Sequence, residues 1–121
     1  MSLYDAASAE AAAEKVAAAL ADMPAEQSGQ PAQWIVGRGW DQTRWPSGQF
    51  PDHRALDARV PDRPVALRRV DGHALWVNRA ALVAAGITAA TRDPPGGRIL
   101  RDAKGQPTGV LVDAAMALVE K

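Results

Sequence analysis

Asp71, Gly72 and His73 place a carboxylate and an imidazole two residues apart in the chain. A carboxylate beside an imidazole can hold the ring in one tautomer and raise its basicity. We therefore hypothesise that His73, with Asp71 behind it, orients a substrate or transfers a proton. The alternative is structural: Asp71 begins a turn, and the His73 ring hydrogen-bonds to a nearby backbone carbonyl.

Two further polar side chains could bind a small molecule. Asn78 could bind a substrate carbonyl through its amide, but its position before a helix-forming stretch makes an N-cap the favoured interpretation. Arg38 follows a strand-like run, where a guanidinium can hold a carboxylate through two hydrogen bonds. An exposed ion pair with the nearby Asp41 is the more common outcome for such an arginine.

Tryptophan is the other residue type with a possible binding role. Trp40 could line an apolar substrate pocket and orient the substrate with its indole N–H group. The same large side chains could instead build the core, above all Trp34 in the middle of its expected strand. The four tryptophans are Trp34, Trp40, Trp45 and Trp76.

The chain lacks the ligand patterns of a hydrolytic metal site. His53 and His73 are its two histidines, neither belongs to an HxH or HExxH pattern, and there is no cysteine. No glycine-rich phosphate loop is present either. We expect no metal, no nucleotide and no catalytic residue in this chain.

The composition is that of a folded domain. The 121 residues are 47% hydrophobic and 23% charged, which allows a modest core. Fourteen basic residues balance fourteen acidic ones, so no overall field attracts nucleic acid. No apolar run reaches the roughly 20 residues that cross a bilayer, and no secretory signal opens the chain. We expect a cytoplasmic protein without nucleic-acid or membrane partners.

Hydrophobic periodicity and turn residues predict the α+β class, a small mixed domain of short strands and hairpins packed with about four helices. Asp52, Asn78 and Asp113 are expected helix N-caps, and Gly86 is the expected left-handed residue after a helix. Turns are expected at 71–72 and 102–105, and an ordered aromatic loop at 39–51. The expected helices cover 5–23, 54–60, 80–85 and 114–121, and the expected strands cover 33–37, 65–70, 74–77, 98–101 and 108–112.

The two chain ends receive separate interpretations. Residues 1–3 look like an expression leader, so the predicted domain is 4–121 and they are left out of the expected fold. The last expected helix reaches Lys121 without a capping residue, as though the chain were cut there.

Short motifs in a fixed order give the chain a family resemblance. Together they resemble the amidohydrolase superfamily, in the branch of amidohydrolase family 3 that includes the N-substituted formamide deformylases. The motifs are Gly39-Trp40-Asp41, Trp45-Pro46, Leu56-Asp57, Pro64-Val65, Asp71-Gly72-His73, Asn78, Ala81-Leu82, Gly86-Ile87, Asp93-Pro94, Gly97-Arg98-Ile99 and Gly105-Gln106-Pro107-Thr108-Gly109-Val110-Leu111.

The resemblance implies a metal-dependent hydrolase of carbon–nitrogen bonds other than peptide bonds. It implies a TIM-type barrel whose metal ligands include an HxH pair, with zinc or another divalent metal in the parent enzyme. This chain would be an insertion segment without those motifs, lying after the first barrel strand at the active-site mouth. It would shape the substrate pocket, bind the small-molecule substrate with the rest of the barrel, and be inactive alone. The implied substrate-binding residues are Arg38, Trp40, Asp71, His73 and Asn78.

A different class of function remains open beside the enzyme fragment. The chain could be a stand-alone small-molecule binding or protein-assembly module without catalysis. In the fragment interpretation, apolar surface that packs on the barrel would be exposed, and such surface tends to drive self-association. We therefore expect a dimer or larger species at high concentration.

Overall fold

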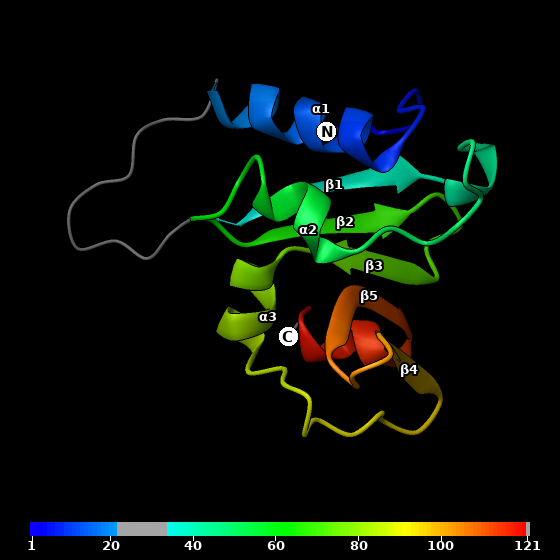
Figure 1. Ribbon diagram of the computed structural model, residues 1–121, viewed down its shortest axis with the longest axis vertical. Helices are drawn as coiled ribbons and strands as arrows, with labels where there is room; N and C mark the ends of the chain where they lie inside the picture. Colours follow the sequence, from blue (N-terminus) through cyan, green and yellow to red (C-terminus); the bar gives the residue numbers. More distant parts are fainter. Residues whose placement is uncertain (22–33, 121) are drawn as a thin grey trace.

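The computed structural model describes residues 1–21 and 34–120 and shows a five-stranded mixed sheet with helices packed against it (Figure 1). The strand order is β1-β2-β3-β5-β4, in which β1 and β2 are parallel and the other neighbours are antiparallel. The α+β expectation is confirmed, with three α-helices and two short 3-10 helices in the described part of the chain. The strands are β1 (Ile35–Trp40), β2 (Val65–Arg69), β3 (Ala74–Val77), β4 (Gly97–Arg101) and β5 (Pro107–Asp113), and the helices are α1 (Ala9–Ala21), η1 (Gln42–Arg44), α2 (His53–Asp57), α3 (Arg79–Ala85) and η2 (Ala114–Leu118).

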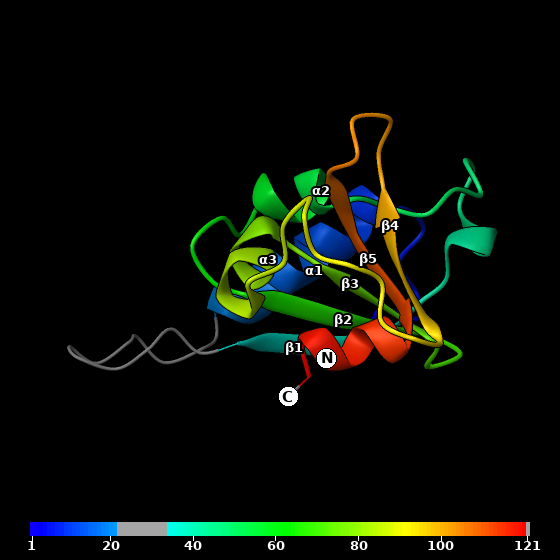
Figure 2. The same cartoon turned by 90° about the horizontal axis from the view of Figure 1, so that it is seen from below.

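Both faces of the central strands are buried, so β3 is apolar at every position. Because strand side chains alternate between faces, successive residues of β2, β3 and β5 enter two different hydrophobic clusters. One cluster packs against α1 and α2, which lie on the same side of the sheet (Figure 2). The other packs against α3 and η2. Residues facing the first cluster are Ile35, Val65, Leu67, Ala74, Trp76 and Val110, and those facing the second are Ala66, Leu75, Val77, Ile99 and Leu111.

The predicted caps of α2 and α3 are confirmed. Asp52 accepts a hydrogen bond from the Arg54 amide, and Asn78 accepts one from the Ala81 amide. Gly86 follows α3 in the left-handed region at φ 74°, and Ile87 folds back to donate to the Leu82 carbonyl.

The first helix is shorter than the predicted range 5–23. It begins at Ala9 because a turn at residues 4–5 precedes it and Ser8 accepts a hydrogen bond from the Ala11 amide at 3.0 Å. Residues 22 and 23 of the predicted range lie outside the described residues.

Both predicted hairpins are confirmed. The β2–β3 turn has Gly72 at φ 78°, and the β4–β5 turn has Gly105 at φ 80°. In the second turn the Asp102 carboxylate accepts from the amides of Lys104 and Gln106, which fixes its shape.

The first strand lies further along the chain than the predicted range 33–37. Trp34 precedes β1 and is 37% exposed, whereas the strand continues to the buried Trp40. The interpretation of Trp34 as the middle of a core strand is therefore wrong, and Gln33 lies outside the described residues. The expected aromatic loop begins only after Trp40 and contains η1.

Residues 1–3 belong to the folded structure, in contrast to the expectation that set them aside. Ser2 forms a parallel bridge with Arg38 beside β1, and the Leu3 amide donates to the Arg38 carbonyl at 2.8 Å. Leu3 is completely buried in the cluster that packs against α1 and α2. This short extended segment therefore covers the free edge of β1.

The final helix is a 3-10 helix, Ala114–Leu118, and not the predicted α-helix 114–121. Asp113 makes no capping hydrogen bond with its side chain, so the expected cap is wrong. The segment lies so close to β4 that a Cβ atom on Gly97 would come 2.3 Å from the Ala115 nitrogen. Lys121 lies outside the described residues.

Candidate functional site

Charged side chains gather where the parallel strands β1 and β2 end and β3 begins. A bulge at Gly39, with φ 106°, shifts the pairing between β1 and β2 by one residue. Arg38, before the shift, is exposed like Val36 on the same face of the strand, and because of the shift Trp40 turns to the other face and has no exposed surface. The glycine between them thus separates a polar outer surface from a buried aromatic one.

Arg69, at the end of β2, is the centre of a hydrogen-bonded network. Its guanidinium contacts the Asp71 carboxylate at 2.7 Å, the Gln42 side-chain carbonyl at 2.8 Å and the Asp41 carboxylate at 3.2 Å. The Arg69 side chain is only 16% exposed. Contacts on three sides hold the end of β2 to the segment that follows β1.

Both carboxylates of this network have a pKa below the usual range for aspartate. The Asp41 pKa is lowered chiefly by the hydrogen bond from the Thr43 hydroxyl, and also by the charge of Arg69. The Asp71 pKa is lowered chiefly by the hydrogen bond from the His73 amide, with Arg69 again contributing. Both groups are therefore ionised at neutral pH.

The His73 ring contacts a different carboxylate from the one the sequence suggests. Asp71 accepts a hydrogen bond from the His73 backbone amide at 3.0 Å, which is the turn interpretation. The ring Nδ1 atom lies 3.0 Å from the Asp113 carboxylate instead. Because the His73 side chain is 72% exposed, its ring is accessible from outside the chain.

Asp113 has an unusual backbone conformation. Its φ of 52° and ψ of −123° are strained for a residue with a Cβ atom, and it is the one non-glycine residue with positive φ among those described. Its amide donates to the His73 carbonyl at 2.9 Å. Backbone and side chain of Asp113 therefore both bond to His73.

Asn78 is fully buried, and the structure confirms it as the cap of α3. Its side-chain oxygen accepts from the amides of Ala81 and Val65, and its side-chain nitrogen donates to the carbonyls of Val60 and Arg63. These four bonds use both acceptor positions and both donor hydrogens of the amide.

The tryptophans near this region form part of the core. Trp40, Trp45 and Trp76 lie 5.9–6.2 Å apart between ring centroids, mostly edge to face. Each indole N–H donates to a backbone carbonyl, and that of Trp40 donates to Leu67 at 2.7 Å. Trp40 thus stabilises the β1–β2 pair from inside and offers no exposed surface of its own within the chain.

Arg38 lies on the wall of a surface cleft of about 490 Å³ between residues 2–4 and the β2–β3 turn. Arg68, Val70 and Gly72 line the same cleft. The ion pair of Arg38 with Asp41 that the sequence suggests does not form, because Asp41 pairs with Arg69.

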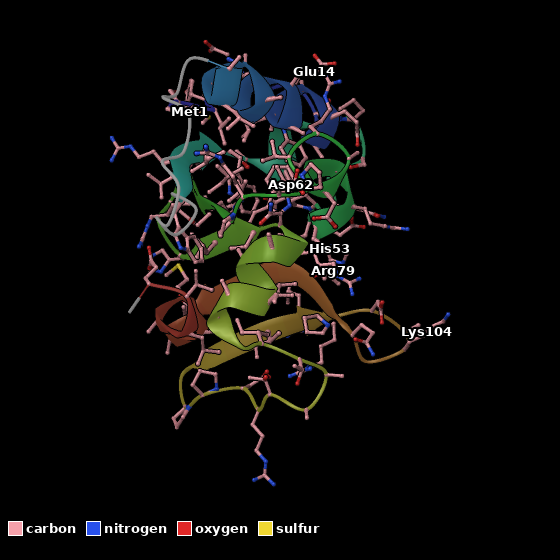
Figure 3. The ribbon with its side chains drawn as sticks, turned by 90° about the vertical axis from the view of Figure 1, so that its left-hand side faces the viewer. Met1, Glu14, His53, Asp62, Arg79 and Lys104 are labelled. Carbon is pink, nitrogen blue, oxygen red and sulfur yellow. The ribbon has the colours of Figure 1, made fainter. Side chains whose placement is uncertain are left out.

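A second histidine–aspartate pair lies at the start of α2. His53 Nδ1 is 2.6 Å from the Asp57 carboxylate, whose other oxygen accepts from the Arg79 amide at 2.8 Å. Figure 3 shows His53 and Arg79 close together at the first residues of α2 and α3. This pair joins two helices and has a structural explanation.

Sequence reasoning missed Arg69, Gln42 and Asp113. Arg69 and Asp41 each follow or end a strand, and parallel pairing of β1 with β2 brings them together. A recognisable signal was the charge of Arg69 near the end of the predicted strand 65–70, whereas Asp41 lies four residues beyond the predicted strand 33–37.

No group of three or more histidine, cysteine or acidic side chains gathers to hold a metal ion in residues 1–21 and 34–120. In the same part of the chain, no helix has the length and apolar character to span a membrane. The described residues therefore do not fit a hydrolytic metal centre.

Comparisons with known proteins give a consistent family. A family model described as "Amidohydrolase family" matches residues 1–121. "Putative amidohydrolase YtcJ" of Bacillus subtilis is 47% identical over 88 residues, which cover 73% of this chain and 17% of that protein. "N-substituted formamide deformylase" of Arthrobacter pascens is 38% identical over 89 residues, which cover 74% of this chain and 16% of that protein.

A similar fold occurs in a solved structure. An uncharacterised metal-dependent hydrolase from Pyrococcus horikoshii matches with a TM-score of 0.64 and 21% identity, over 98% of this chain and 19% of that chain. The chain thus spans less than a fifth of the length of these relatives.

Proposed function

The chain belongs to the amidohydrolase family, and from this premise we propose that it is a segment of a metal-dependent hydrolase of carbon–nitrogen bonds other than peptide bonds. A relative named as a formamide deformylase supports this bond type. The chain covers 16–17% of the curated relatives described above, which supports a segment within a larger enzyme. We assign it to an insertion after the first strand of a TIM-type barrel, in a cytoplasmic enzyme.

Within that enzyme, the segment shapes the substrate pocket, and His73 faces the substrate. The observation that carries this assignment is an imidazole that is 72% exposed yet held by the Asp113 carboxylate at 3.0 Å. When the ring carries a proton on both nitrogens, Nδ1 can bond to Asp113 while the free Nε2–H donates a hydrogen bond to a substrate carbonyl. Asp71 fixes the turn that carries the ring, and Arg38 lies in the neighbouring cleft.

The divalent metal, zinc or another, is assigned to the rest of the parent enzyme. The described residues contain no group that could hold it. Bound there, the metal would polarise the scissile carbonyl and activate water. The role of this chain is to bind and orient the substrate beside that centre.

The decisive test uses the full-length parent enzyme with His73→Ala. Loss of an orienting donor should lower kcat/KM by about tenfold or more. Lys104→Ala is the control, because Lys104 lies at the tip of the β4–β5 turn (Figure 3). Unchanged kcat and KM in His73→Ala would refute the substrate-facing role.

The isolated chain provides a second test. Without a metal site, it should not hydrolyse N-formyl or N-acyl amines even after zinc is added. Stoichiometric zinc in metal analysis, or measurable turnover that requires this chain, would contradict the proposal.

The barrel is also the expected partner of apolar surface on this segment. Val36 is 65% exposed on β1 and Val83 is 70% exposed on α3. Such residues should drive self-association of the isolated chain. Sedimentation that shows only monomer at millimolar concentration would contradict this expectation.

A further inference from the structure

Two arginines lie side by side in the cleft beside β1. Arg38 and Arg68 are direct partners in the parallel pairing of β1 with β2, and both line the cleft of about 490 Å³. Arg68 follows Ala66 by two residues, so it lies on the face of the second cluster. Its partner Arg38 is exposed. Like charges opposite each other destabilise a sheet unless an anion compensates them.

Within the described residues, one carboxylate compensates the charge of Arg68. Glu120, just after η2, forms an ion pair with the Arg68 guanidinium. A second guanidinium nitrogen of Arg68 donates to the Gly72 carbonyl at 3.2 Å, which orients the group along the cleft. The contact with Glu120 therefore shows that the Arg68 guanidinium can bind a carboxylate.

Arg38 has no such compensation. Among residues 1–21 and 34–120 no carboxylate lies within salt-bridge distance of its guanidinium. The nearby Asp41 and Asp71 both pair with Arg69. The cleft therefore retains an excess of positive charge at Arg38.

We propose that this cleft binds the carboxylate of a small organic anion between Arg38 and Arg68, with Glu120 displaced from Arg68. Two planar guanidinium groups suit the two oxygens of a carboxylate, and the cleft volume is in the usual range for small-molecule sites. Gly72 lines the cleft and His73 is the next residue. The identification of this anion as the substrate rests on the proposed function. Binding of the anion to the chain does not.

The test is a titration of the 121-residue chain with sodium succinate, followed by the amide chemical shifts of residues in β1, β2 and their turn. Ionic strength is held constant, and neutral succinamide is the matched ligand control. Succinate should shift the amides near Arg38, Arg68 and Gly72, and succinamide should not. Arg38→Gln and Arg68→Gln should each weaken binding by about tenfold, since each removes a charged partner.

Two further variants sharpen the result. Arg98→Gln removes the same charge from an exposed position on β4 and should leave succinate affinity unchanged. Glu120→Gln removes the competing carboxylate and should tighten binding by about threefold, because an exposed ion pair is weak. Should Arg68→Gln disturb the fold, Arg38→Gln and Glu120→Gln decide the outcome.

Equal shifts with succinamide, or equal weakening in Arg98→Gln, would overturn the proposal. Tighter binding of inorganic phosphate than of succinate would overturn the commitment to a carboxylate. The titration does not measure hydrolysis. If the parent enzyme proved inactive, the proposed function would fail, but the amide shifts caused by succinate would remain.

Discussion

His73 and Asp113, forty residues apart in the sequence, are joined by both a side-chain and a backbone contact. The ring Nδ1 lies 3.0 Å from the Asp113 carboxylate, and the Asp113 amide donates to the His73 carbonyl at 2.9 Å. These contacts tie the start of β3 to the end of β5. Asp113 adopts its strained backbone conformation at this junction. The two contacts with His73 therefore hold Asp113 in a conformation that costs free energy locally.

The strain at Asp113 predicts an unusual stability response. Asp113→Gly should raise the free energy of unfolding by about 1 kcal/mol relative to Asp113→Ala, because glycine tolerates φ near 52°. Both variants lose the exposed carboxylate contact, so the difference between their free energies of unfolding reports the backbone strain at position 113. Urea unfolding of the two variants measures it. Equal stability would mean that the Asp113 backbone stores no strain.

The hydrogen bond from Thr43 to Asp41 predicts an acid-sensitive contribution to stability. The Asp41 pKa is lower in the folded chain than in the unfolded chain, so its stabilisation is present above about pH 4. It is lost as the pH falls through the folded value. Thr43→Val should raise the Asp41 pKa in an NMR titration and flatten the loss of stability in acid.

Asp71 provides the internal control for that variant. Its pKa is lowered first by the His73 amide, so Thr43→Val should leave it unchanged. An unchanged Asp41 pKa in Thr43→Val would contradict the assignment of the hydroxyl as the main cause.

Local features of the fold could be predicted from the sequence because their causes lie within a few residues. The Asn78 cap, the left-handed Gly86 and the turn at Gly72 depend on side-chain reach and on glycine's access to positive φ. The same local chemistry led to the confirmed turn interpretation of Asp71.

Long-range features were not accessible in this way. The parallel pairing of β1 with β2 creates the Arg69–Asp41 contact, and the end of β5 brings Asp113 to His73. Burial of Leu3 depends on an edge beside β1 that only the folded sheet provides. His73 as a site residue stays a prediction, and the partner of its ring was assigned from proximity along the chain, whereas the ring contacts Asp113.

The four hydrogen bonds of Asn78 predict a large cost on substitution. Asn78→Ala would leave two buried amides and two carbonyls without their partner, and each such group costs about 1–3 kcal/mol. We expect a loss of at least about 3 kcal/mol in urea unfolding. Asp52→Ala, which removes the cap of α2, should cost only about 1 kcal/mol. A similar cost for both would show that Asn78 acts as a cap alone.

The bulge at Gly39 gives the prediction that links fold and cleft. Gly39→Ala meets two obstacles, since φ is 106° and a Cβ atom would lie 3.1 Å from the Tyr4 nitrogen. Gly105→Ala meets only the first, because its φ is 80° and nothing lies within 4 Å. Gly105→Ala should cost about 1 kcal/mol, and Gly39→Ala clearly more.

The additional cost in Gly39→Ala should come with a structural change, because the bulge lets Arg38 face the cleft while Trp40 faces the core. Crowding of Tyr4 would loosen the segment of residues 1–4 from β1 and disturb the wall of the cleft. Amide exchange should therefore accelerate at Leu3, whose amide donates to the Arg38 carbonyl, and at Arg38, whose amide donates to the Met1 carbonyl. If exchange at these two amides matched that in Gly105→Ala, the alanine at position 39 would not loosen residues 1–4 from β1. The predicted link between the bulge and the cleft would then be wrong.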